Sequence, residues 1–217
     1  EFRRVLFRSF TGVQAFPMLS VIALSIGGTT IIQAITFLPK LGQEDFIGNL
    51  LRLVIIREVG PLLTAIIVLA RSGSAITAEM CTQKMHREID SMEMMGINPH
   101  LIMVLPRLAG GVISLVLLII YFDVIAIIGG YLISLLVTSF PFSTFVDSIA
   151  KSITMTDLLS TFIKSVLSGL LIPLTCTYYG FKPESLFQIP IFVSKAVIRS
   201  LFAVFLLNAF ISVLFYL

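Results

Sequence analysis

Five long stretches of this sequence contain no charged residue, and they decide the class of protein. They cover residues 9–39, 108–122, 124–146, 165–181 and 200–217. A helix needs about 20 apolar residues to cross the hydrocarbon core of a bilayer, and several stretches reach or approach that length. Only 12% of the 217 residues are charged, about half the share in a typical soluble domain. The sequence therefore excludes a disordered chain and an ordinary cytosolic enzyme, and it predicts an all-α polytopic membrane protein.

The hydrophobic pattern predicts about five transmembrane helices, at residues 13–38, 50–78, 101–138, 158–181 and 191–217. Residues 101–138 fit either one long helix or two short spans. We favour one helix, because the glycine pair at 129–130 lacks the polar neighbours of a turn. A polar connection is expected at 139–157. Residues 1–9 differ in character from the rest of the chain, so we expect a truncated or non-native start and a single domain at 10–217.

The densest charge lies between the second and third spans, at residues 79–96. Met85, Ile89 and Met92 recur there at helical spacing, which predicts an amphipathic helix outside the hydrocarbon core. Its acidic residues outnumber its basic ones, so anionic headgroups would repel it. Docking of a soluble protein is therefore favoured over lipid anchoring. The charged residues of this predicted docking helix are Glu79, Lys84, Arg87, Glu88, Asp90 and Glu93.

The distribution of Lys and Arg predicts the orientation of the spans. Ten of the fifteen basic residues fall on the side that holds the N-terminus, the 79–96 helix and the loop at 182–190. We therefore expect that side to be cytoplasmic. The basic residues form no stripe along one face, so the sequence gives no support for a nucleic-acid partner.

Charged residues inside the apolar context are the candidate functional residues. Arg57, Glu58 and Lys164 fall toward the non-cytoplasmic half of the predicted spans. Such residues are costly in a membrane and usually face a cavity, a pathway or one another, although they can also snorkel to the interface as anchors. Gly60 and Pro61 follow soon after Glu58 and loosen backbone packing, which favours a pathway. Asp123 is left open between a helix-packing pair and a pathway group.

No catalytic or metal-binding pattern is evident in the sequence. The two histidines, His86 and His100, lie near the charged helix rather than inside a span, so no serine within a span has a histidine base. Cys81 and Cys176 are far apart and form no metal-ligand spacing. No phosphate loop ending in GK[ST] occurs. We therefore expect no enzyme, no metal site and no cofactor in this chain, and ATP hydrolysis only in a partner.

Residues 57–111 closely resemble the MlaE-type permease family. The segments that carry the resemblance are REVGPLLTA, ARSGSAITAE, KMHREIDSMEMMGINP and the PR that comes next. The resemblance continues in FDVIAIIGGYL and FIKSVLSG and is weaker elsewhere. Members of this family are the membrane subunits of ABC transporters that move phospholipid between the bacterial inner and outer membranes. Departures occur as well, because Cys81 and Gln83 stand where the family usually has Gly and Met, and Asn208 replaces a frequent acid.

The resemblance implies a homodimer of multi-pass subunits in the bacterial inner membrane. It also implies a cytoplasmic ABC ATPase, loaded with ATP and magnesium, that docks on a coupling helix at 79–96. A periplasmic MCE-domain protein that binds lipid is a further implied partner, and some systems add a STAS-domain protein. By the same resemblance, Gln33, Arg57, Glu58 and Lys164 line a phospholipid pathway. A permease for another hydrophobic substrate, such as sterols, and a membrane scaffold that transports nothing are the alternatives.

Overall fold

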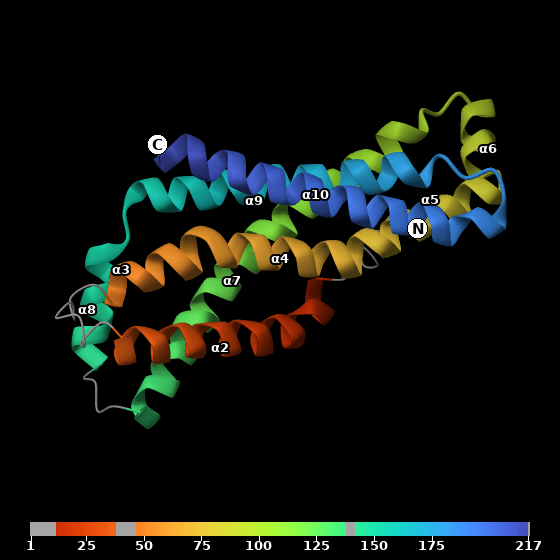
Figure 1. Cartoon of the computed structure of the whole chain (residues 1–217). Helices are drawn as coiled ribbons and strands as arrows, with labels where there is room; N and C mark the ends of the chain where they lie inside the picture. The colour runs from red at the N-terminus through yellow and green to blue at the C-terminus, as the bar shows by residue number, and fades with distance from the viewer. Residues whose placement is uncertain (1–11, 38–46, 138–141, 217) are drawn as a thin grey trace.

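The computed structural model describes residues 12–37, 47–137 and 142–216, and every regular element in these ranges is helical. Figure 1 shows the long helices running side by side, with α8 and the C-terminus at one end and α6 at the other. The α-helices are α2 Gly12–Phe37, α3 Ile47–Leu51, α4 Gly60–Val68, α5 Ser74–Met85, α6 Glu88–Met94, α7 Leu105–Val137, α8 Phe142–Ser152, α9 Met155–Gly180 and α10 Ile189–Tyr216. The π-helices are η3 Arg52–Val59, η4 Leu69–Gly73 and η5 His100–Val104, and a 3-10 turn, η6, covers Leu186–Gln188.

Within the described ranges, five continuous helical stretches are long and apolar enough to cross a membrane. They are Phe16–Phe37, Gly48–Met85, His100–Leu135, Met155–Gly180 and Leu186–Phe215. The predicted all-α fold with five spans is therefore confirmed. The third span is one continuous helix, as the absence of a polar turn at the glycine pair indicated.

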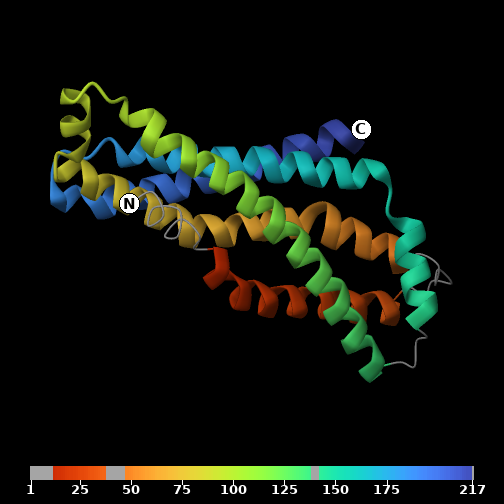
Figure 2. The same ribbon diagram turned by 180° about the vertical axis from the view of Figure 1, so that it is seen from behind.

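Close contact between helix backbones holds the long helices together. Helix α7 crosses the bundle obliquely in both views (Figures 1 and 2) and packs against α2 on one side and α9 on the other. A Cβ atom at Gly27 of α2 would lie 2.0 Å from the carbonyl oxygen of Ala126, and one at Gly169 of α9 would lie 2.7 Å from the Cα of Val112. Only glycine fits at these two crossings, and small residues are the usual means by which membrane helices approach closely.

The region 139–157, predicted as a polar connection, contains a helix instead. Helix α8 buries Phe145 and Ile149, which are four residues apart, and exposes Asp147 and Lys151 on its other side. It packs against α3 at the end of the bundle far from α6. The prediction missed this helix because Asp147 and Lys151 suggested a loop, whereas they form the polar side of an amphipathic helix.

The predicted amphipathic helix at 79–96 is divided in the structure. Helix α5 continues to Met85. Its residue Met80 is fully buried against α9: a Cβ atom at Gly180 would lie only 2.4 Å from the Cβ of Met80. The chain then turns at Arg87, which has a left-handed φ of 57°. Only α6, Glu88–Met94, stands across the end of the bundle. Gly96, with φ of 73°, lies just beyond its end.

Candidate functional site

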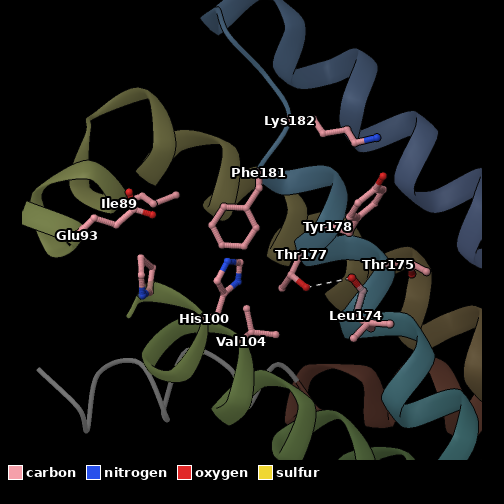
Figure 3. A pocket seen from close by; sticks show the side chains of 11 residues that line it. Ile89, Glu93, His100, Val104, Leu174, Thr175, Thr177, Tyr178, Phe181 and Lys182 are labelled. Carbon is pink, nitrogen blue, oxygen red and sulfur yellow. Dashed lines mark hydrogen bonds between the residues drawn. The ribbon is translucent and has the colours of Figure 1, made fainter. Parts of the chain in front are cut away.

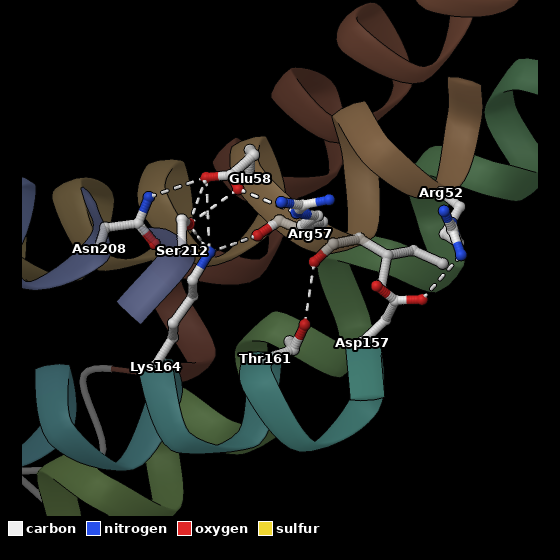
Figure 4. A network of polar contacts seen from close by, with 9 residues as sticks. Arg52, Arg57, Glu58, Asp157, Thr161, Lys164, Asn208 and Ser212 are labelled. Carbon is white, nitrogen blue, oxygen red and sulfur yellow. Dashed lines mark hydrogen bonds and ion pairs between the residues drawn. The ribbon is translucent and has the colours of Figure 1, made fainter. Parts of the chain in front are cut away.

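A cluster of charged and polar side chains joins three helices in the half of the bundle nearer α8 (Figure 4). Its centre is the carboxylate of Glu58, at the end of η3. Ser212 of α10 donates to Glu58 Oε1 and Oε2 at 2.8 and 3.0 Å. Asn208, one turn earlier on α10, donates to Glu58 Oε2 at 3.4 Å. Lys164 of α9 lies 3.4 Å from the same oxygen. The carboxylate is thus surrounded by donors from both neighbouring helices.

Pro61 follows directly after the π segment η3 and Gly60, whose N–H donates to the Ile55 carbonyl. Proline has no N–H, so it cannot donate to the carbonyl four residues earlier, at Arg57, or five residues earlier, at Ile56. Lys164 donates to the Arg57 carbonyl at 2.7 Å, and Thr161 donates to the Ile56 carbonyl at 3.1 Å. Two side chains of α9, one turn apart, therefore bind the two carbonyls that an N–H at position 61 would reach in a π or an α pattern.

Lys164 is a buried ammonium whose donors are all engaged. Its side chain is 1% exposed, and its Nζ contacts the Arg57 carbonyl, Ser212 Oγ at 2.7 Å and Glu58. Three partners match the three N–H groups of an ammonium. In this structure Lys164 therefore acts on the protein itself: it neutralises Glu58 and holds the backbone of η3.

Arg57 is the more accessible cation of the cluster. Its Nε lies 3.4 Å from Glu58 Oε1, and its side chain is 19% exposed, compared with 1% for Lys164. The Glu58 side chain is 35% exposed. Two cations and one carboxylate give the cluster a net positive charge, and a planar guanidinium is suited to bidentate contact with a phosphate. The arrangement can therefore bind an anionic group at Arg57.

A second ion pair fixes the start of α9 beside η3. Arg52 Nη1 lies 3.2 Å from Asp157 Oδ2 and donates to the Ser152 carbonyl at 3.0 Å. Asp157 is buried and also accepts from the backbone N–H of Thr154 at 3.1 Å, as part of a capping box. Because one cation binds both the end of α8 and the start of α9, the segment that carries Thr161 and Lys164 is held in register with η3.

The structure brings together three of the four predicted pathway residues. Arg57, Glu58 and Lys164 meet in the cluster, whereas Gln33 is exposed on α2, which packs mainly along α7. No described contact joins Gln33 to the cluster. Ser212 was missed by the sequence analysis. The signal was available, because Asn208 and Ser212 are four residues apart and share one side of an otherwise apolar helix.

Asp123 lies against the second span rather than in the cluster. A Cβ atom at Gly60 would sit 2.3 Å from Asp123 Oδ1, so glycine at this position makes room for the carboxylate. Among the described residues, Oδ1 of Asp123 has no hydrogen-bond partner. Asp123 therefore packs against Gly60 where α7 contacts α4.

The predicted docking residues fall into two groups, one in contact with neighbouring helices and one exposed. Glu79 and Lys84 belong to α5: Glu79 pairs with the buried Arg107 at 3.4 Å, and Lys84 donates to the carbonyl of Phe181 at 2.6 Å. Both therefore tie α5 to neighbouring helices. The remaining residues are exposed on the turn and on α6, where they are available to a partner: Arg87, Glu88, Asp90 and Glu93. No group of three possible metal-ligating side chains occurs within the described ranges.

Comparison with known proteins gives a consistent family assignment. The family described as Permease MlaE matches residues 8–214. The Haemophilus influenzae intermembrane phospholipid transport system permease protein MlaE is 32% identical over 78% of this chain and 66% of its own length. A probable ABC transporter permease protein of Rickettsia typhi is 27% identical over 79% of this chain and 66% of its own.

A plant relative extends the comparison to nearly the whole chain. The chloroplastic protein TRIGALACTOSYLDIACYLGLYCEROL 1 of Arabidopsis thaliana is 25% identical over 95% of this chain and 59% of its own length. The chain thus spans about two thirds of the length of the bacterial relatives. Together with the five spans and the family match from residue 8 to residue 214, these similarities show that the chain belongs to the MlaE permease family.

Proposed function

We propose that this chain is the membrane permease subunit of an ABC transporter that moves phospholipids between the inner and outer membranes of a bacterium. The family match and the name of the Haemophilus relative support this substrate class. The observation that carries the proposal is the cluster at Glu58, a net positive group of ionisable residues inside the membrane-spanning helices. Ionisable residues inside membrane-spanning helices are costly and usually mark a substrate pathway.

In the proposed mechanism, Arg57 binds the phosphate of the lipid and Lys164 positions Arg57. The guanidinium is the more accessible cation of the cluster, at 19% exposure, whereas the ammonium of Lys164 is enclosed and binds the carbonyl of Arg57 itself. Glu58 keeps both cations in place and limits the net charge. The apolar sides of the spans accommodate acyl chains, which prefer them to water.

The proposed assembly follows what the family implies. Two copies of the chain form the membrane unit, and a cytoplasmic ABC ATPase, which supplies ATP and magnesium, docks on the acidic helix α6. A periplasmic MCE-domain protein takes up or delivers the lipid, and a STAS-domain protein is a further candidate partner. The basic residues at the α6 end support a cytoplasmic location for that end by the positive-inside rule. The proposed location of the chain is the bacterial inner membrane.

The test is ATP-driven transfer of a fluorescent phospholipid between vesicles by the assembled transporter. Removing a charge-assisted hydrogen bond to the phosphate by Arg57→Gln is expected to slow transfer about tenfold or more, since such bonds contribute about 1.5–3 kcal/mol. Arg57→Lys restores part of the rate, because it keeps the charge without the planar fork. Lys151→Gln is the matched control, because Lys151 is exposed on α8, outside the cluster. Normal transfer by a fully assembled Arg57→Gln transporter would refute this role.

A further inference from the structure

A cavity of about 660 Å³ lies at the α6 end of the bundle, between α6, the start of the third span and the end of α9 (Figure 3). Sites that bind small organic ligands typically have volumes of about 300–1,000 Å³. The cavity extends from Lys182, beyond the end of α9, to Leu174, two turns into that helix. It therefore extends along the last two turns of the membrane-spanning helix α9. It lies far from the Glu58 cluster, toward the opposite end of the bundle.

The walls of this cavity are effectively apolar. Ile89, Val104, Leu174 and Phe181 contribute side chains, and the ring of His100 lies 5.2 Å from that of Phe181. The threonine hydroxyls in the wall are already bonded to their own helix: Thr175 donates to the carbonyl of Leu171 at 2.9 Å, and Thr177 donates to that of Pro173 at 2.7 Å. A hydrocarbon chain can therefore enter without leaving these hydroxyls unpaired.

Exposed apolar side chains flank the cavity on both sides. Leu174 and Tyr178 of α9 are more than half exposed, and so are Leu101 and Leu105, next to the lining residues of the third span. In a membrane-spanning bundle, exposed apolar residues at this depth face lipid tails. The cavity is thus adjacent to the acyl layer of the leaflet at the α6 end.

The rim of the cavity on the α9 side is basic. Lys182 Nζ lies 4.2 Å from the centre of the Tyr178 ring, and the Arg199 guanidinium lies 5.6 Å from that of Tyr179. Lys195 belongs to the same end of α10. Among the described residues, no carboxylate forms an ion pair with these three cations. The one acidic lining residue, Glu93, lies on the opposite wall, and the Lys182 ammonium points away from it (Figure 3).

We propose that this cavity binds one phospholipid from the leaflet at the α6 end, with an acyl chain between α6 and α9 and the phosphate at Lys182. Lys182, the one lining cation, forms no ion pair with a described carboxylate, and it favours a lipid with net negative charge, such as phosphatidylglycerol. Basic residues near a membrane surface attract anionic lipids by about 1 kcal/mol each, which corresponds to about fivefold in affinity. Because the site includes Ile89 and Glu93 of α6, a bound lipid contacts the helix that we propose as the ATPase docking element. The lipid is a resident ligand, and its binding does not depend on what the Glu58 cluster transports.

The absence of tryptophan from the 217 residues makes a direct test possible. Phe181→Trp places a single fluorophore in the cavity wall. The chain is reconstituted without other subunits in phosphatidylcholine vesicles that contain a minor share of brominated phosphatidylglycerol. The paired sample carries the bromine on phosphatidylcholine instead, in vesicles of the same overall composition. Bromine on an acyl chain quenches tryptophan only at short range, so the two samples report which lipid occupies the cavity.

We expect brominated phosphatidylglycerol to quench Phe181→Trp with an apparent affinity about fivefold above that of brominated phosphatidylcholine. Adding Lys182→Gln removes this preference, whereas Lys195→Gln retains it, because Lys195 does not line the cavity. Phe202→Trp, an exposed position on α10, gives the non-selective quenching of bulk lipid. Leu174→Trp at the mouth serves as a second reporter if Phe181→Trp fails to fold.

Two results would overturn the proposal. Equal quenching by the two lipids at both reporters would mean that the cavity is in contact with bulk lipid and has no preference for the anionic one. Absence of quenching would mean that it holds no acyl chain and is covered by protein instead. Arg57→Gln is expected to leave the quenching unchanged, so this site and the proposed transport function can fail separately.

Discussion

Replacing Lys164 by methionine should destabilise the bundle through one backbone carbonyl. Methionine keeps the apolar stem and removes the ammonium, so the Arg57 carbonyl loses the donor at 2.7 Å, and Pro61 cannot replace it. An unsatisfied buried acceptor costs about 1–3 kcal/mol. The lost pair with Glu58 adds about 0.5–1 kcal/mol, because that carboxylate is 35% exposed and keeps Ser212 as a donor. The expected loss in the free energy of unfolding is therefore about 1.5–4 kcal/mol.

A second substitution tests the cause of this loss. Pro61→Ala supplies an N–H at the position from which an α-helix would donate to the Arg57 carbonyl. In the Lys164→Met chain this N–H satisfies the orphaned carbonyl, whereas in the wild-type chain Lys164 already does so. The double-mutant cycle should therefore show favourable coupling of about 1 kcal/mol. The measurement is unfolding in mixed micelles with increasing denaturing detergent, monitored by the helical circular dichroism signal.

Two results would count against this reasoning. If Lys164→Met unfolds within about 0.5 kcal/mol of the wild-type chain, as changes away from buried polar groups usually do, the carbonyl contact has no energetic weight. If Pro61→Ala has the same effect in both backgrounds, proline is not the reason why the carbonyl needs Lys164. Thr175→Val is a suitable control, since it removes a helix-bonded hydroxyl far from Pro61 and should not couple to Pro61→Ala.

Two further substitutions test packing and docking. Gly60→Ala places a Cβ 2.3 Å from Asp123 Oδ1 and 2.8 Å from the Ile55 carbonyl, so we expect a loss of about 1–3 kcal/mol in the same unfolding assay, and partial recovery on adding Asp123→Ala. A loss that Asp123→Ala leaves unchanged would show that the two residues do not share this space. Asp90→Lys on α6 should weaken binding of the purified partner ATPase about two- to fivefold at low salt and less at high salt, because exposed charges contribute up to about 1 kcal/mol and are screened. Unchanged affinity would exclude α6 as the docking element.

The class of fold could be predicted from the sequence because it depends on composition over long windows. A stretch such as 108–122 admits few structures other than a membrane helix or a deeply buried one. Short elements were harder. Helix α8 exposes Asp147 and Lys151, and these charges suggested a loop. The buried residues Phe145 and Ile149 have the four-residue spacing of one helix face, but two residues are too few to predict a helix. The end of α5 was misplaced because Met80 and Cys81 are buried by tertiary contacts that the local sequence does not reveal.

The cluster could be predicted in part for a similar reason. Charges in an apolar context are visible in the sequence, so Arg57, Glu58 and Lys164 could be identified without the structure. What those charges contact was not visible, since π and α hydrogen bonding differ by one residue in the position of the acceptor. The sequence indicates that Pro61 loosens the backbone. The structure shows that Lys164 binds the carbonyl that an N–H at position 61 would reach in an α-helix, and this contact makes Lys164 a buried support rather than an exposed ligand.

The second span contains a π segment on each side of α4. This nine-residue α-helix lies between the π-helices η3 and η4, and a π-helix holds more residues per turn than an α-helix. Moving one residue from one π segment to the other would advance α4 by about 1.5 Å and rotate it by about 100°, from the rise and twist of a helix. The span can thus change register at its centre while α3 and α5 stay in place. Lys164 and Thr161 bind carbonyls of η3, so they stabilise the π segment before α4 and oppose such a shift.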